Sequence, residues 1–211
     1  MKYGESLFDI LYLLFAIIIG IKVIRSKHKL SKLMGLSILI LGFGDSFHLI
    51  PRVLNYFINY DFTSYLGVGK LITSITMTIF YIFIYYIYLK NYDIKENRII
   101  TYCIWILSII RIVLSLMPQN NWLTNNSPFI WGIIRNIPFV IMGLLITILY
   151  FNKRNNDKDF KYIWLYILLS FIFYLIVVIG ASSINILGMF MLPKTICYIL
   201  IINSFNKKSK R

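Results

Sequence analysis

The chain has 211 residues, of which 59% are hydrophobic, and its mean hydropathy is +0.74. Soluble domains contain about 45 to 50% apolar residues, so this composition excludes a water-soluble globular fold. The formal net charge is +14. Basic residues beside membrane segments set topology and contact anionic headgroups, so we expect membrane lipids, and no nucleic acid, as partners.

Seven apolar segments are long enough to cross a hydrocarbon layer, which takes about 20 helical residues. They cover residues 6–24, 33–57, 65–89, 98–117, 128–151, 160–180 and 183–204. The last two are separated only by the turn Gly180-Ala181-Ser182. The sequence therefore predicts an all-α bundle of seven transmembrane helices in a single domain, residues 1–204, followed by a short basic tail, residues 205–211.

The first segment, residues 6–24, lacks a small-residue cleavage site and precedes the main lysine cluster, so it predicts a retained helix. Sixteen of the 22 basic residues fall at alternate ends of the seven segments. They are Lys22, Arg25, Lys27, Lys29, Lys32, Lys90, Lys95, Arg98, Lys153, Arg154, Lys158, Lys161, Lys207, Lys208, Lys210 and Arg211. Because positive loops stay in the cytoplasm, the N-terminus is predicted outside and the C-terminus in the cytoplasm.

Three polar residues share one face of the second segment. Asp45, His48 and Arg52 follow the spacing i, i+3, i+7, which brings side chains to one side of a helix. Asp45 is the only acid that the sequence places clearly at membrane depth. This face is the first candidate for a polar site inside the bundle.

Four more basic residues lie within later segments: Lys70, Arg111, Arg135, which precedes Asn136, and Lys194. A charge at mid-bilayer costs at least about 2.5 to 3.5 kcal/mol, so each of these cations needs a physical reason. At about 1.5 Å per residue, Lys194 reaches nearly the same depth as Asp45, and we expect these two residues to form an ion pair.

The leading hypothesis is a binding or transport protein whose outward-facing basic cavity takes an anionic small molecule or lipid headgroup, because a bound anion would offset the excess of cations. The expected ligand-binding residues are Asp45, His48, Arg52, Lys70, Arg111, Arg135, Asn136 and Lys194. One alternative is a membrane enzyme acting on a lipid phosphate or ester, with Asp45 and His48 as acid and base. A third is a purely structural polar network.

The run Gly42-Phe43-Gly44-Asp45-Ser46-Phe47-His48 resembles the second-helix motif of the alkaline ceramidase and adiponectin-receptor-like membrane hydrolases. That family is a seven-helix bundle with zinc held by three histidines. This chain has only His28 and His48, so its last segment cannot supply a histidine pair. We therefore expect no metal site.

Lys194, in the middle of the seventh segment, also resembles the lysine that carries retinal in the microbial rhodopsins. The resemblance implies retinal on Lys194 as an alternative to our expectation of no cofactor. Phe190 stands one turn earlier, where that family has an acid. As a whole, the sequence is similar to uncharacterised bacterial seven-helix membrane proteins, which implies a multi-pass protein of the bacterial plasma membrane.

Overall fold

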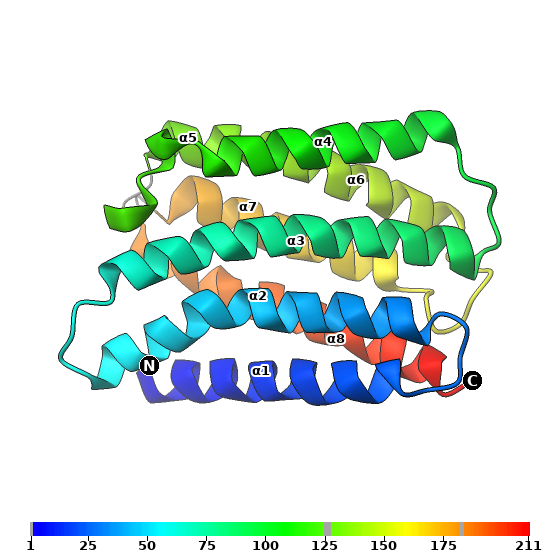
Figure 1. Ribbon diagram of the computed structural model, residues 1–211, viewed down its shortest axis with the longest axis horizontal. Coiled ribbons are helices and arrows are strands. Elements are labelled where there is room, and N and C mark those ends of the chain that lie inside the picture. The colour runs from blue at the N-terminus through cyan, green and yellow to red at the C-terminus, as the bar shows by residue number, and fades with distance from the viewer. Residues whose placement is uncertain (1, 125–127, 182–183) are drawn as a thin grey trace.

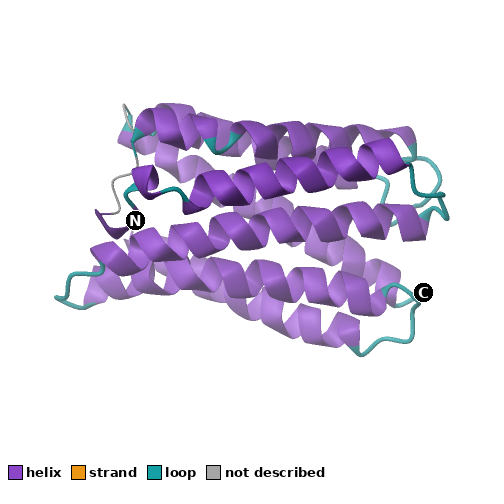
Figure 2. Cartoon of the chain, turned by 45° about the horizontal axis from the view of Figure 1, so that its top comes forward, coloured by secondary structure: helices purple, strands orange, loops and turns teal. Residues whose placement is uncertain are grey.

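The computed structural model describes residues 2–124, 128–181 and 184–211, and every regular element over these ranges is helical (Figures 1 and 2). Seven of these helical segments are long and apolar enough to cross a membrane. The prediction of an all-α, multi-pass bundle is therefore confirmed. The predicted turn at Ser182 falls on residues 182 and 183, outside the described residues.

The helices run alternately up and down along the bundle. Their bounds are Lys2–Ile24 for α1, Ser31–Phe57 for α2, Thr63–Asn91 for α3, Arg98–Leu116 for α4, Phe129–Ile134 for α5, Ile137–Asn152 for α6, Ile163–Gly180 for α7 and Met191–Ser209 for α8. Three 3-10 helices join them: η1 (Pro118–Asn120), η2 (Trp122–Thr124) and η3 (Asn185–Phe190). We call the end where α1 begins the N-terminal end, and the end where α8 finishes the C-terminal end (Figure 1).

The fifth predicted helix, residues 128–151, is divided into α5 and α6 at Arg135 and Asn136. Pro138 lies in the first turn of α6, where the missing N–H has no intrahelical acceptor to lose. The Asn136 side chain donates to the carbonyl of Gly132 at 2.7 Å, which satisfies a backbone group at the break. The seventh predicted helix, 183–204, likewise starts later than expected, because η3 precedes α8.

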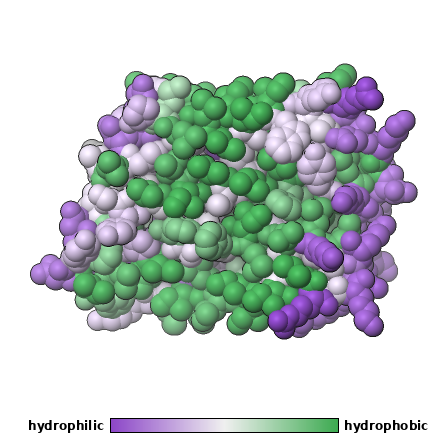
Figure 3. All heavy atoms as spheres, viewed as in Figure 1, coloured by the Kyte–Doolittle hydropathy of each residue, from purple (hydrophilic) through white to green (hydrophobic). Residues whose placement is uncertain are grey.

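Apolar side chains cover the middle of the molecule, and polar side chains gather at its two ends, most densely at the C-terminal end (Figure 3). Large hydrophobic residues such as Leu11, Ile18, Ile106 and Ile148 are exposed along the helices. Such a belt suits a hydrocarbon environment, where apolar side chains face lipid rather than water.

Aromatic residues fill the centre of the bundle around α3, which packs against α2, α4 and α6. The ring centroid of Tyr81 lies 5.2 Å from that of Phe139 on α6 and 5.2 Å from that of Phe171 on α7. Phe80 contacts Tyr198 on α8 with a centroid distance of 6.0 Å. These five residues are buried, and we call them the aromatic layer.

The C-terminal segment belongs to the packed structure. α8 continues to Ser209, because Phe205 is buried against Phe160 in the α6–α7 connection. Lys208 forms an ion pair with Asp157 in the same connection, and the Asn91 amide donates to that carboxylate at 3.0 Å. Most of the predicted free tail, residues 205–211, is therefore helical.

The helices α2 and α3 approach each other closely at Gly69. A Cβ atom at this position would clash with the backbone carbonyl of Phe47 and lie 2.8 Å from the Cα atom of His48. Backbone atoms cannot move aside as a flexible side chain can. The contact between the two helices therefore requires glycine here.

We expect Gly69→Ala to lower the free energy of unfolding by about 1 to 3 kcal/mol, the usual cost of overpacking a tight contact. Thermal unfolding of the purified protein in detergent measures this. Gly132→Ala is the matched control, because a Cβ there meets no atom within 4 Å and helix propensity favours alanine. Equal stability of the two variants would contradict the close approach.

The Asp157 carboxylate makes the stability of the folded protein depend on pH. Burial alone would raise its pKa, but the hydrogen bonds from Lys208 and Asn91 outweigh burial and hold the pKa below its usual value. Its contribution to stability is therefore complete above the unfolded pKa of about 3.9 and is lost as the pH falls through the folded pKa.

The unfolding temperature should fall as the pH is lowered from about 5 to about 3, and Asp157→Asn should flatten part of that fall, because an amide does not titrate. Asp93→Asn, at an exposed position in the α3–α4 connection, should keep the wild-type profile. If Asp157→Asn keeps the wild-type dependence of the unfolding temperature on pH, the ion pair with Lys208 contributes nothing to stability.

Candidate functional site

A cavity of about 480 Å³ lies inside the bundle, in the half nearer the N-terminal end. Its wall comes from the second half of α2, the first half of α3, the end of α7 and the start of α8, with single residues from α4, η2, α6 and the break between α5 and α6. This volume falls within the range of about 300 to 1,000 Å³ that is typical of small-molecule sites.

Seven of the eight predicted site residues line this cavity: Asp45, His48, Arg52, Lys70, Arg111, Arg135 and Lys194. The five cations come from five different membrane crossings. Their helices are thus rotated so that the basic side chains face one space. The eighth residue, Asn136, is not part of the cavity lining in the described structure.

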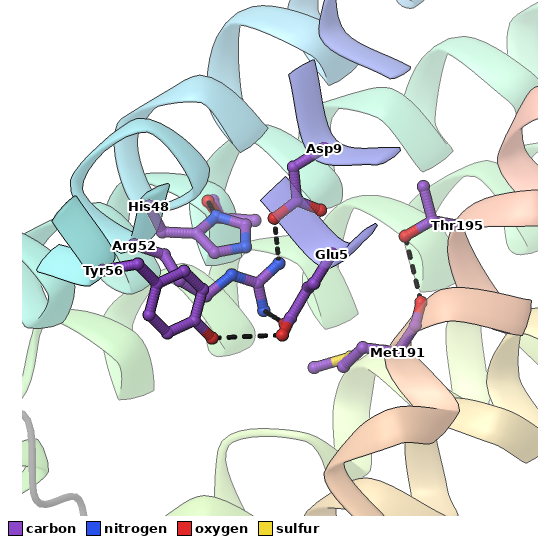
Figure 4. Close-up of polar contacts among 8 residues, drawn as sticks. Glu5, Asp9, His48, Arg52, Tyr56, Met191 and Thr195 are labelled. Carbon is purple, nitrogen blue, oxygen red and sulfur yellow. Dashed lines mark hydrogen bonds and ion pairs between the residues drawn. The ribbon is translucent and has the colours of Figure 1, made fainter. Parts of the chain in front are cut away.

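Arg52 is held by two acids from α1. Its Nη2 atom lies 2.8 Å from Asp9 Oδ2, and its Nη1 atom lies 3.3 Å from Glu5 Oε1. Figure 4 shows the guanidinium reaching from α2 to both carboxylates, with Tyr56 donating to Glu5 at 3.1 Å. Asp9 is only 3% exposed, so a second buried acid accompanies Asp45 in this half of the bundle.

Asp45 accepts a hydrogen bond of 2.7 Å from the hydroxyl of Tyr12 on α1. Among the described residues, it forms no direct ion pair with Lys194, which corrects the expected pairing. The two residues line the same cavity, as their similar depth predicted. Tyr12 supplies the donor that the sequence analysis assigned to Lys194.

Lys194 lies against aromatic rings. Its Nζ atom is 4.6 Å from the ring centroid of Tyr174 and 5.5 Å from that of Tyr198. The Tyr174 hydroxyl donates to Asn136 Oδ1 at 2.8 Å. Asn136 therefore positions a ring beneath the ammonium group. Retinal attachment at Lys194 stays a prediction.

Arg135 sits at the break between α5 and α6 and contacts the segment that connects α4 to α5. Its Nη1 atom donates to Asn120 Oδ1 at 2.7 Å, and its guanidinium carbon lies 4.4 Å from the Trp122 ring centroid. The Trp122 indole in turn donates to the carbonyl of Ser115 at 2.8 Å. This connection fixes one wall of the cavity.

Arg111 is the most deeply buried of the five cations, at 2% exposure. Its guanidinium carbon lies 3.1 Å from the ring centroid of Phe139. Its Nε and Nη1 atoms are buried and make no hydrogen bond with any residue that the structure describes. A buried guanidinium without acceptors is costly, so this residue requires an explanation.

His48 lines the cavity between α2 and α3. Its Nδ1 atom lies 2.9 Å from Thr73 Oγ1 on α3. Within the described ranges, His48 and Asp45 share no hydrogen bond, so the acid–base pair of the enzyme alternative is not in direct contact. No three His, Cys, Asp or Glu side chains in these ranges lie close enough to hold a metal ion.

The aromatic layer closes the cavity on the side of the C-terminal end, where two of its members, Phe139 and Tyr198, line the cavity. Met77 lines the cavity, and Tyr81 follows one helical turn further along α3. The Tyr81 hydroxyl lies 3.2 Å from Ser170 Oγ on α7, and both residues are buried. The layer thus separates the cavity from the lysine-rich end of the bundle.

Sequence reasoning missed the contributions of α1 and of Thr73 on α3. Glu5, Asp9 and Tyr12 recur at helical spacings of four and three residues, a pattern that predicts one polar face on α1. This signal was available in the sequence. The role of Thr73 had no comparable signal, because threonines are common in membrane helices.

No protein-family model matches the chain, and no curated protein or solved structure matches it. The resemblances to hydrolases and rhodopsins stay predictions. The functional hypotheses therefore rest on the geometry of the cavity.

Removing one partner of Arg52 should destabilise the protein. We expect Asp9→Asn to lower the free energy of unfolding by about 1 to 3 kcal/mol, less than for a fully buried pair because Arg52 is partly exposed. Glu5→Gln, at a more exposed carboxylate, should cost about 0 to 1 kcal/mol.

A double-mutant cycle separates this ion pair from other effects. Arg52→Gln should cost less in the Asp9→Asn background than in the wild type, with a coupling energy of about 0.5 to 3 kcal/mol. Chemical unfolding in detergent supplies the four stabilities. Strictly additive costs would mean that Arg52 and Asp9 do not interact.

Proposed function

We propose that this protein binds an anionic small molecule or an anionic lipid headgroup in its cavity and acts as a membrane binding or transport protein. The ligand contacts would come from Arg52, Lys70, Arg111, Arg135 and Lys194, with Asp45 and His48 beside them and Asn136 behind Tyr174.

The charge of the cluster supports this proposal. Five cations and Asp45 line the cavity, and Glu5 and Asp9 reach Arg52 from α1. Five cations against three carboxylates leave a net formal charge of +2. In an apolar bundle such an excess is unfavourable, and an anion with two negative charges would neutralise it.

Arg111 is the observation that carries the proposal. A structural network pairs a buried cation with counterions, as Glu5 and Asp9 do for the two terminal nitrogen atoms of Arg52. Arg111 instead presents buried nitrogen atoms without acceptors in the wall of a cavity that a small molecule fits. Guanidinium groups bind carboxylate and phosphate oxygens with short, charge-assisted hydrogen bonds.

The side from which the ligand enters follows from the loop charges. The cavity lies in the half of the bundle opposite the lysine-rich connections. With the N-terminus outside and the C-terminus in the cytoplasm, the cavity would face the outside of the cell, in our proposal the outside of a bacterial plasma membrane. Transport would require the aromatic layer to open.

Arg111→Met tests the proposal directly. Replacing a guanidinium that has no acceptors with an apolar side chain of similar length should leave the stability of the unliganded protein unchanged or raise it. The same change should abolish the rise in unfolding temperature that a bound anion causes. For the wild type, an anion at about 100 times its dissociation constant stabilises by about 2.7 kcal/mol.

The measurement is thermal unfolding in detergent at constant ionic strength, with sulfate, inorganic phosphate, a dicarboxylate and an anionic phospholipid added in turn. Arg154→Met is the matched control. Arg154 also lies over a phenylalanine ring, at 3.9 Å, but outside the cavity, and it should keep the wild-type response.

No response of the wild type to any of these anions would overturn the proposal. If Arg111→Met then also proved strongly destabilised, the structural network would be favoured. The enzyme alternative predicts a different pattern, in which His48→Gln abolishes turnover of a lipid phosphate or ester and leaves anion binding intact.

A further inference from the structure

The hydroxyl group of Thr73 determines which nitrogen of His48 carries a proton. Thr73 Oγ1 lies 2.9 Å from the carbonyl oxygen of Gly44 on α2 and 2.9 Å from that of Gly69 on α3. Carbonyl oxygens only accept hydrogen bonds, so the single hydroxyl proton is directed toward these two atoms. The third neighbour of Oγ1 is His48 Nδ1, at 2.9 Å. Nδ1 must therefore carry a proton and donate it.

The other ring nitrogen consequently presents a lone pair. In a neutral histidine with a proton on Nδ1, Nε2 is an acceptor. In the described part of the chain Nε2 makes no hydrogen bond, and the ring lines the cavity beside Arg52 (Figure 4). An oxyanion that enters the cavity also presents only acceptors. The two groups can form a hydrogen bond only if a proton lies between them.

The charged groups around the ring favour that proton once an anion is present. Those that face the cavity with His48 are Asp45 and Arg52 on α2, Lys70 on α3, Arg111 on α4, Arg135 at the α5–α6 break and Lys194 on α8, with Glu5 and Asp9 of α1 behind Arg52. The cations outnumber the acids. A bound anion offsets their repulsion and favours the charged form of the imidazole.

We propose that the binding of a fully ionised oxyanion is coupled to the uptake of one proton at His48 Nε2. The proton comes from the aqueous phase, the ring becomes an imidazolium ion, and the new N–H donates to the anion. This inference rests on the proposed anion site and adds a specific role for His48. Coupling of this kind is reciprocal, so lowering the pH must strengthen anion binding. In a transport cycle, the anion and a proton would cross together.

Calorimetric titration with sulfate tests the inference, because sulfate stays fully ionised near neutral pH and any proton taken up must go to the protein. The apparent binding enthalpy is measured at about pH 7 in Tris and in bis-Tris, whose ionisation enthalpies differ and whose charged forms are cations that do not compete for the site. The slope of the binding enthalpy against the buffer enthalpy gives the number of protons, and we expect about one per sulfate.

The variants localise the proton. His48→Gln should bring the slope close to zero, while His28→Gln should keep the wild-type slope. His28 is the matched control because it lies in the α1–α2 connection at the far end of the bundle, where its Nδ1 accepts from the backbone N–H of Leu30. In the wild type, sulfate affinity should fall by up to about tenfold per pH unit once the ring has lost its proton.

Sulfate binding without any buffer dependence would overturn the inference and leave the proposed function standing. Binding of inorganic phosphate but not of sulfate would also overturn it, because the P–OH group of phosphate would then supply the donor for Nε2. Absence of binding for every anion would overturn both proposals together. If His48→Gln does not fold, a wild-type slope near zero still overturns the inference, and His48→Asn supplies the second variant that localises the proton.

Discussion

The cost of positive charge in an apolar bundle governs this structure. A buried cation needs groups that replace its hydration, and the bundle supplies different groups for four of the five cations. Arg52 has carboxylates, Lys194 has the faces of two tyrosine rings, and Arg135 has an amide oxygen and an indole ring. Among the described residues, Arg111 has the face of Phe139 and no hydrogen-bond acceptor for its Nε and Nη1 atoms. The buried positive charge that is least compensated thus lies at one wall of one cavity.

The elements that follow from hydrophobic length and loop charge could be predicted from the sequence. The seven crossings and the five basic residues within them belong to this class. Convergence on one cavity was a hypothesis that the sequence alone could not test, because the rotation of each helix depends on its neighbours. The expected pairing of Asp45 with Lys194 shows what helix geometry alone can predict. It gave a similar depth for the two residues, which line the same cavity, but the Asp45 carboxylate accepts its hydrogen bond from Tyr12 on a third helix. The break at Arg135 is a similar case, since Pro138 is compatible with a kinked or a divided helix.

The contact between α2 and α3 connects backbone packing with proton chemistry. Small residues let the helices approach, and the carbonyl group of Gly44 on α2 then lies within reach of Thr73, which also contacts the carbonyl group of Gly69 one turn earlier on α3. In the proposal above, these two contacts leave Thr73 Oγ1 as an acceptor for His48 Nδ1, which lies 2.9 Å away. The protonation pattern of the imidazole therefore depends on the register of two helices and needs no carboxylate partner. Nothing in the linear sequence marks this relation, because it involves backbone atoms of one helix and side chains of another.

The placement of both Arg52 counterions on α1 has a consequence for biosynthesis. Glu5 and Asp9 belong to α1, which leaves the ribosome before α2, and Arg52 lies near the end of α2. Until α2 is made, α1 carries carboxylates that have no cation to match them and that oppose its entry into lipid. The α1–α2 hairpin is the smallest unit in which these charges compensate one another. Insertion of the two helices as a pair is thus the route with the lower electrostatic barrier, and the cavity begins to take shape in that pair before the remaining crossings exist.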